Sequence, residues 1–253
     1  MIPALMIGRK GSRVKDKNVR PVLGRPLCLY PILAAKNSSS VSQVYVSTDC
    51  DKIHQVALEQ SCTLIERPAH LATNEALAED AFQHGYEWIG RQLETEHPRE
   101  KIEFIVLLFA NGITITPGLI DEGVRFLRAN PDFDSAVSVS KYNMFSALRA
   151  RKIENGLVRP FVDPALFSNA TCDRDSQGDT YFVDCSIFVL RPRCFDYSKG
   201  ELPFRWIGRK VHPLHQEAGF DVDFEWQFPV VEWFLKQNGF TESSTPYEKM
   251  KQK

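Results

Sequence analysis

The residues best suited to chemistry in this sequence of 253 residues lie in a basic, glycine-containing segment near its start. Residues 8–18 read Gly-Arg-Lys-Gly-Ser-Arg-Val-Lys-Asp-Lys-Asn and follow the apolar run 3–7. Glycine lets a backbone come close to a ligand, exposed amides can form an anion nest, and Arg and Lys neutralise phosphate. The segment is therefore predicted to hold a polyphosphate at the end of a buried strand.

A solvated surface turn is the alternative interpretation of the same segment. Gly8 and Gly11 are its only glycines before Gly24, so it has neither the Walker spacing nor the dinucleotide-binding spacing. Its predicted position favours the phosphate interpretation, because the loop after the first strand of an α/β sheet is a favoured phosphate site.

A second group with chemical potential is Asp221-Val222-Asp223 near the end of the sequence. Two carboxylates at positions i and i+2 that leave a strand end point the same way and can share the coordination shell of a Mg²⁺ ion. Asp223 could instead be the N-cap of the helix that follows, but this would account for only one of the two aspartates.

The elements that must position these groups alternate along the first half of the sequence. Apolar runs predict strands, and helical spacing or caps predict helices between them, over the ranges 4–7, 44–47, 63–65, 104–109 and 135–139 for strands and 27–37, 51–60, 75–92 and 117–129 for helices. Asp49 or Asp51 is the expected N-cap of the second helix. The alternation predicts a doubly wound, mostly parallel α/β sheet. Ligands bind such sheets beyond the carboxyl ends of the strands, where residues 8–18 would lie.

Three regions are expected along the chain. Residues 1–140 form a nucleotide-binding α/β core, and residues 141–180 form a hairpin or arm that contains Asn155-Gly156. Residues 181–253 complete the core with a strand at 180–190 and a last helix through Lys236. The aromatic residues of this helix region are expected to form its buried face: Phe224, Trp226, Phe228, Trp233 and Phe234.

Composition narrows the classes of partner. The net charge is −1, which argues against nucleic acid and acidic membrane surfaces as partners. No apolar stretch approaches the length of a membrane span, and the first residues lack the apolar region of a signal peptide. The six scattered cysteines show no metal-ligand spacing and several lie in apolar runs, so we expect buried thiols, without a disulfide framework, in a reducing, cytoplasmic setting.

Several short motifs occur in an order that resembles one family. They are Arg9-x-Gly11-Ser12, Lys17-Asn18 and the segments 21–27, 46–49, 67–72 and 221–223. Together they resemble the acylneuraminate cytidylyltransferases, which are the CMP-sialic acid synthetases and their relatives acting on other nonulosonates and on 3-deoxy-octulosonate. The resemblance is good over residues 1–140 and looser over 180–236. One such motif would be weak, but their common order makes the resemblance specific.

The resemblance implies a Rossmann-like fold of the nucleotide-diphospho-sugar transferase type, with 141–180 as a dimerisation arm. It implies that the CTP triphosphate contacts Arg9, Gly11, Ser12 and Lys17, that Asn18 closes the nucleotide pocket and that Arg67 lies near the cytosine. It also implies that Asp221 and Asp223 hold Mg²⁺, with Arg9, Lys17 and Asp221 as the catalytic groups. The spacing from Arg9 to Lys17 is one residue shorter than the family pattern, so Lys15 is an alternative to Lys17.

The reaction implied by the resemblance joins CTP to a sugar acid in a homodimeric enzyme. The anomeric hydroxyl of a 2-keto-3-deoxy sugar acid attacks the α-phosphate and releases pyrophosphate. Preorganised cations and a hard divalent ion supply most of such catalysis, because negative charge develops on the leaving group.

Departures from the family pattern concentrate where the sugar acid should bind. Phe109 and Ile115 stand where many members carry glutamine and arginine, which leaves Asn111 and Asp184 as the expected substrate-binding groups. An altered acceptor is therefore expected. The alternatives are a 3-deoxy-octulosonate enzyme, a sugar nucleotidyltransferase using UTP or GTP, a sugar-transferring enzyme with a D-x-D metal site, and a nucleotide-binding homologue without turnover.

Overall fold

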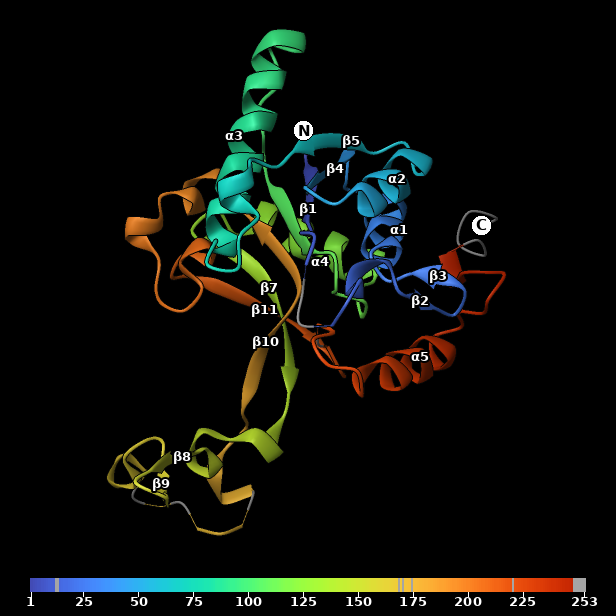
Figure 1. Cartoon of the computed structure of the whole chain (residues 1–253). Helices are drawn as coiled ribbons and strands as arrows, with labels where there is room; N and C mark the ends of the chain where they lie inside the picture. The colour runs from blue at the N-terminus through green and yellow to red at the C-terminus, as the bar shows by residue number, and fades with distance from the viewer. Residues whose placement is uncertain (12–13, 168, 170, 174, 220, 248–253) are drawn as a thin grey trace.

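A central seven-stranded sheet organises the molecule (Figure 1). The structure, a computed structural model, describes residues 1–11, 14–167, 169, 171–173, 175–219 and 221–247. The strands lie in the order β11-β7-β10-β6-β1-β4-β5, with bounds β1 Pro3–Ile7, β4 Gln43–Thr48, β5 Thr63–Glu66, β6 Ile105–Phe109, β7 Ser135–Lys141, β10 Tyr181–Leu190 and β11 Val211–Gln216. Neighbouring strands are parallel except that β10 runs antiparallel to both β6 and β7. The expected doubly wound, mostly parallel sheet is confirmed.

Helices cover both faces of this sheet because its central strands are apolar on both sides. In β1, Ala4 and Met6 pack into one core cluster, while Leu5 and Ile7 pack into the other, as the alternation of side chains along a strand requires. The first cluster includes side chains of α1 (Leu29–Asn37), α2 (Asp51–Glu59) and α4 (Pro117–Ala129). The second includes α3 (Ala78–Glu96). The expected helices are all present, although α3 begins and ends later than predicted.

A third apolar cluster joins the last helix to a small hairpin. Helix α5 (Gln227–Gln237) packs its Phe228, Val231 and Leu235 against the region of β2 (Pro21–Val22) and β3 (Arg25–Pro26). The prediction that the aromatic residues around this helix form its buried face is wrong for most of them. Trp226 is 66% exposed and Trp233 is 61% exposed, because the helix contacts the core through the 228/231/235 stripe alone.

The arm at residues 141–180 projects from the sheet in Figure 1. Its centre is the antiparallel hairpin of β8 (Arg151–Glu154) and β9 (Leu157–Pro160), which confirms the predicted hairpin. Asn155 and Gly156 form the turn with φ of 51° and 75°, values that these two residue types tolerate. Ile153, Val158 and Leu166 are at least two-thirds exposed, so the arm carries uncovered apolar surface.

Strand β11 is an element that the sequence did not predict. It reads Val-His-Pro-Leu-His-Gln, and only Leu214 is buried. The strand lies at the edge of the sheet, where proline is tolerated and one partner strand, β7, is enough to hold it. Polar edge strands lack the apolar alternation by which a sequence reveals a strand.

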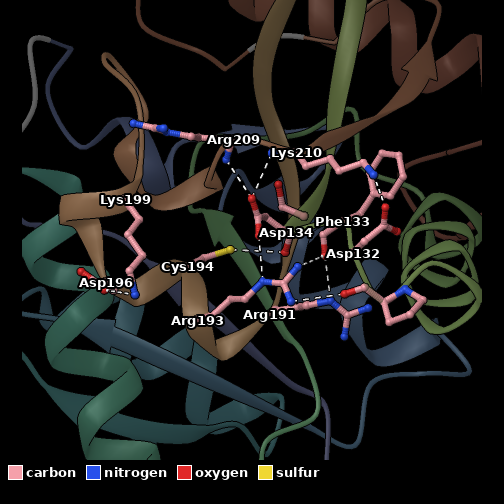
Figure 2. A network of polar contacts seen from close by, with 12 residues as sticks. Asp132, Phe133, Asp134, Arg191, Arg193, Cys194, Asp196, Lys199, Arg209 and Lys210 are labelled. Atoms are coloured by element: carbon pink, nitrogen blue, oxygen red, sulfur yellow. Dashed lines mark hydrogen bonds and ion pairs between the residues drawn. The ribbon is translucent and has the colours of Figure 1, made fainter.

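A polar network around Asp134 holds the starts of β7 and β11 together (Figure 2). The Asp134 carboxylate accepts hydrogen bonds from the backbone N–H of Arg209 and Lys210, both at 2.9 Å, and from Arg193 Nε at 2.8 Å. The Lys210 ammonium also pairs with Asp132. The cations at 205–210, for which the sequence suggested no role beyond solubility, thus have structural partners.

The structure bears on two expectations drawn from composition. All six cysteines are free thiols; Cys28, Cys62 and Cys194 are buried as expected, whereas Cys50 and Cys185 are partly exposed and Cys172 is exposed. Within the described ranges, no helix combines the length and apolarity that crossing a membrane requires.

Candidate functional site

A cavity of about 320 Å³ opens beside the carboxyl ends of β1 and β6. Both polar and apolar residues line it. Its polar lining comprises Gly8, Arg9, Gly11, Lys17, Asn18, Arg67, Asn111 and Asp223. The structure therefore brings together most of the residues that the sequence singled out, although they lie up to 215 positions apart along the chain. Ser12, predicted to contact the triphosphate, lies outside the described residues.

The basic turn is held close to the sheet by its glycines and by Asp49. Gly8 N–H donates to Ser47 O, and a Cβ at Gly8 would come within 2.7 Å of Ala110 Cβ, so a larger residue would push the turn away. Gly11 has a φ of 82°. Asp49 Oδ1 accepts a hydrogen bond of 2.7 Å from Lys10 N–H. Asp49 thus fixes the turn, and the prediction that Asp49 or Asp51 caps α2 is wrong, since Cys50 occupies the N-cap position without a side-chain cap.

Lys17 is the lysine that the fold turns into the cavity. It begins the short 3₁₀ segment Lys17–Val19, it is 8% exposed, and its Nζ lies 2.6 Å from Asp223 Oδ1. Lys15 is exposed and does not line the cavity. Burying an ammonium is costly unless an anion accompanies it. Asp223 supplies that anion, and its own side chain is half exposed.

Asp221 is the more buried member of the acidic pair. It lies in the loop after β11, where it forms an isolated bridge with Gly112, and not at a strand end as expected. Its Oδ2 accepts a 3.0 Å hydrogen bond from Asn111 Nδ2. Burial raises the pKa of Asp221, and the charge of Asp223 raises it further, whereas the bond from Asn111 and the charge of Lys17 act in the opposite direction.

These two carboxylates suit a divalent cation. Crowded acidic groups whose charges destabilise one another are stabilised by a cation between them. In the part of the chain that the structure describes, no three or more His, Cys, Asp and Glu side chains gather as a metal-binding group. A dedicated protein cage is therefore absent from the described residues. A pair of carboxylates completed by substrate phosphates and water is the usual Mg²⁺ arrangement in phosphate chemistry.

Arg9 projects from the turn toward the segment that precedes α3. Its Nη1 donates to Asn74 Oδ1 at 2.7 Å and to Thr73 O at 3.1 Å. These neutral acceptors orient the guanidinium without cancelling its charge. Arg9 therefore keeps its positive charge at the edge of the cavity, where an anion can approach it.

Arg67 lies deeper, at the end of β5. It is 6% exposed, and its Nη2 donates to Ser47 O at 2.7 Å. Burial lowers the pKa of Arg67 to about 10, so the guanidinium remains protonated at neutral pH. Its Nε also donates to Ser47 Oγ at 3.4 Å, so the Nε–Nη2 edge of this cation is fixed by Ser47 of β4 and the Nη1 group is left for a ligand in the cavity.

Asn18 carries a buried acceptor without a partner. Its Nδ2 lies 3.5 Å from Arg9 O, but among the described residues its Oδ1 has no hydrogen-bond donor. An unsatisfied buried polar group costs roughly 1–3 kcal/mol. A hydroxyl or amino group of a ligand in the cavity would remove this cost.

The apolar wall of the cavity is a feature that the sequence did not reveal. It is formed by Ile7, Leu71, Ala76, Leu77, Ala78, Ala81 and Phe109. Most of these residues lie in α3 or just before it, and their helical spacing predicts only a face packed on the sheet. A lining that combines apolar side chains with a few fixed polar groups is typical of sites for small molecules.

Asp184, predicted to bind substrate, does not line this cavity. It is 5% exposed, and its two oxygens accept hydrogen bonds from four neutral donors: Ser138 Oγ, Ser140 Oγ, Ser186 N–H and Gln216 Nε2. The structure thus gives its carboxylate internal partners in the sheet. Asn111, the other expected substrate group, lines the cavity and also holds Asp221.

A second cavity of about 370 Å³ lies against Asp221. Four of its ten lining residues are aromatic: Tyr142, Phe145, Phe182, Val183, Asp184, Gly219, Asp221, Trp226, Gln227 and Val230. Asp223 lines the first cavity and Asp221 lines the second, so the acidic pair joins two spaces of different chemistry.

Comparison with known proteins agrees with this geometry. The cytidylyltransferase family model matches residues 5–84. Post-translational flagellin modification protein B of Campylobacter coli is 25% identical over 243 residues, covering 90% of this chain and 92% of that protein. N-acylneuraminate cytidylyltransferase of Escherichia coli is 31% identical over 234 residues, and the zebrafish (Danio rerio) N-acylneuraminate cytidylyltransferase A is 24% identical over 250 residues. These matches cover 90% and 97% of this chain, which spans about half the length of those two enzymes.

Two solved structures share the fold. A CMP:2-keto-3-deoxy-manno-octonic acid synthetase complexed with CTP superposes with a TM-score of 0.64 at 16% identity, over 93% of this chain and 98% of its own. The 4-diphosphocytidyl-2C-methyl-D-erythritol synthase of Anaerococcus prevotii gives a TM-score of 0.60 at 12% identity, over 93% and 96%. The family model over residues 5–84 and these curated relatives together support the cytidylyltransferase family for this chain.

Proposed function

We propose that this protein transfers CMP from CTP to the anomeric hydroxyl of a 2-keto-3-deoxy sugar acid and releases pyrophosphate. The observation that carries the proposal is the contact of Lys17 with Asp223 across 206 residues, which joins the basic turn to the acidic pair in one cavity. Several relatives are named N-acylneuraminate cytidylyltransferases, and the structural neighbour of the octonic acid synthetase type holds CTP. Both support CTP as the nucleotide.

The basic turn receives the triphosphate. Lys17 is buried with Asp223 as its anion, and a triphosphate offers this ammonium several oxygens in place of one carboxylate. Arg9 adds a second positive charge from the rim, and the backbone at Gly11 allows close approach. Pyrophosphate leaves with its charge still neutralised by Lys17 and Arg9, which lowers the barrier to its departure.

The cytosine and ribose occupy the inner part of the cavity. The apolar wall of α3 accepts a ring face, Arg67 donates to the base, and the unpartnered Oδ1 of Asn18 accepts from a nucleoside hydroxyl or amino group. These fixed groups orient the α-phosphate without moving during the reaction, which is how preorganisation accelerates group transfer.

Asp221 and Asp223 hold Mg²⁺ in this proposal. When bound, the ion supplies Lewis-acid neutralisation of the phosphates. Asn111 Nδ2 fixes one oxygen of Asp221, and Lys17 gives up Asp223 once the triphosphate provides it with anionic partners. Asp223 would then be free to hold the ion together with Asp221.

The acceptor approaches from the Asp221 side, over Asn111 and Phe109, toward the aromatic second cavity. Ile115 is buried in the core and does not reach either cavity, so the arginine found in many relatives has no equivalent there. We therefore propose a nonulosonic acid other than N-acetylneuraminate as the acceptor.

The exposed apolar arm is proposed to form a homodimer, and the reaction is proposed to take place in the cytoplasm.

The experiment that tests the proposal measures pyrophosphate release with CTP, UTP or GTP and a panel of acids. The panel contains N-acetylneuraminate, other nonulosonates and 3-deoxy-octulosonate, each with and without Mg²⁺. We expect release only with CTP, Mg²⁺ and a nonulosonate. Preference for UTP or GTP would indicate a different nucleotidyltransferase, and CTP binding without release with any acid would indicate a non-catalytic homologue.

A further inference from the structure

Asp184 is a buried carboxylate beside the second cavity, and both of its oxygens accept hydrogen bonds from within the protein. It lies on β10, where extra residues between Val183 and Phe188 break the pairing with β7 and place Cys185 at a φ of 58°. This irregularity turns Asp184 toward Ser138 and Ser140 of β7. A β-bulge of this kind re-aims a side chain and commonly occurs beside functional sites.

The contacts of Asp184 lead to the loop that carries the acidic pair. Its Oδ2 accepts hydrogen bonds from Ser140 Oγ at 2.7 Å and from Gln216 Nε2 at 2.8 Å, at the end of β11. Ser140 Oγ in turn accepts a 2.7 Å hydrogen bond from Gly219 N–H. The Asp184 carboxylate thus contacts the end of β11 directly at Gln216 and the following loop through Ser140 at Gly219, two residues before Asp221.

The close approach of this loop excludes a side chain at Gly219. A Cβ there would lie 2.3 Å from Asp184 Oδ2 and 2.1 Å from Gln216 Nε2, and both atoms are fixed by hydrogen bonds. Glycine is therefore required by the contact with Asp184. The loop is held again on its far side, where Val222 N–H donates to Asn111 O at 3.1 Å.

We propose that Asp184 is a positioning residue that acts through Ser140 and Gly219 to hold Asp221 and Asp223 where the metal and the nucleotide require them. This inference rests on the proposed function for its catalytic consequence. Burying a carboxylate among neutral donors costs free energy. An apolar side chain in its place would accept no hydrogen bonds from these donors, so it would not hold the loop backbone close to the sheet. The hydrogen-bond network that replaces the lost hydration of the carboxylate holds the loop in one geometry.

Two serines of β7 provide a matched pair of variants. Ser138→Ala and Ser140→Ala each remove one hydroxyl that donates to Asp184. The two hydrogen bonds are similar in length, at 2.6 Å and 2.7 Å. Only Ser140 also bonds the loop, through Gly219 N–H. Both variants should therefore lose similar stability, whereas only Ser140→Ala should loosen residues 217–223.

Amide hydrogen exchange of the full-length protein gives a readout that does not depend on turnover. In Ser140→Ala we expect exchange at Gly219 and Val222 to become about tenfold faster, with Ser138→Ala close to wild type at both amides. Asp184→Asn should resemble Ser140→Ala, and Gly219→Ala should show the largest change. Equal exchange in the two serine variants would overturn the inference.

Turnover then links the loop to the reaction. We expect kcat to fall about tenfold in Ser140→Ala, the Mg²⁺ concentration for half-maximal rate to rise, and CTP affinity measured without metal to stay within about twofold. Loss of CTP affinity in step with kcat would mean a general structural role and would overturn the inference. If the wild-type protein shows no turnover, the proposed function fails, while the exchange data still decide the role of Asp184.

Discussion

In the cavity beside the basic turn, charged groups lie buried, whereas in the arm apolar side chains lie in water. Lys17 is 8% exposed, and Ile153 in the arm is 70% exposed. Each arrangement costs free energy in an isolated chain, because a buried ammonium loses hydration and exposed apolar surface costs roughly 25 cal/mol per Å². The cavity therefore indicates an anionic ligand, and the arm indicates an apolar partner surface.

The largest expected effect tests the charged half of this comparison. Replacing Lys17 by Met should lower kcat/KM for CTP by about 10³-fold, because a buried cation that faces developing phosphate charge contributes far more than a solvated one. Lys15→Met is the matched control, since Lys15 is exposed, and it should stay within about twofold. Pyrophosphate release measures both. Equal losses in the two variants would mean that the burial of Lys17 has no catalytic meaning.

The acidic pair should give the next largest effect. Asp221→Asn and Asp223→Asn should each lower Mg²⁺-dependent turnover by about 10²-fold or more, because an amide is a poor ligand for a hard cation. The melting temperature of Asp221→Asn should hardly change, since a neutral side chain there escapes the desolvation that raises the pKa of Asp221. Asp223→Asn should melt at a lower temperature, because the buried Lys17 loses its anionic partner.

The control for the acidic pair lies on the same segment. Glu225 forms an exposed ion pair with Arg20, so Glu225→Gln removes a nearby charge without touching the cavity. Its turnover should match wild type. A comparable loss of turnover in this variant would show that turnover depends on the negative charge of the whole segment, which contradicts a metal site at Asp221 and Asp223.

The apolar half of the comparison is tested in the arm. The double variant Phe161→Asp, Leu166→Asp should raise the dissociation constant of the proposed dimer at least about 100-fold, because charges would replace apolar groups in the interface. Leu202→Asp is the control, since Leu202 is 82% exposed and lies outside the arm. Sedimentation velocity measures all three proteins. A monomeric wild type, or dissociation by the control as well, would show that the arm does not join two copies.

The smallest expected effect tests whether Arg67 contacts the ligand or only stabilises the fold. Arg67→Lys should raise KM for CTP about tenfold and lower the melting temperature by a few degrees, because an ammonium cannot bond Ser47 O and the ligand in the same forked geometry. Arg91→Lys, in an exposed pair on α3, should change neither. If the Arg67 variant loses stability but keeps its KM, then Arg67 belongs to the scaffold alone.

Local patterns were enough to predict the first strand and the basic turn beside the cavity. The apolar run 3–7 is followed at once by the glycines and cations of the turn, so strand, turn and charge are neighbours in the chain as well as in space. The same holds for α4, which begins with Pro117 and Thr116 as its cap and was predicted to the residue. Where the residues that determine an element lie within that element or next to it, their spacing in the sequence is enough to predict it.

Contacts between distant segments were not predictable in this way. The partners of Asp184 come from β7, β10 and β11, and the last of these has no strand signal of its own. Trp226 and Trp233 were expected in the core because aromatic residues usually lie there, yet α5 contacts the molecule through another stripe. A sequence shows which residues share a helix face but not which face the rest of the chain covers.

The amino-acid order by itself therefore determined the class of sheet, the basic turn after β1 and the family motifs that indicate a cytidine nucleotide. The tertiary structure alone decided that Lys17 and not Lys15 enters the cavity, that Lys17 contacts Asp223, and that Asp184 serves the loop after β11. The physical reason is the distance along the chain over which each kind of interaction acts. Backbone propensity and apolar periodicity act over a few residues, whereas the pairing of a buried charge depends on which distant group the packed sheet brings within hydrogen-bond reach.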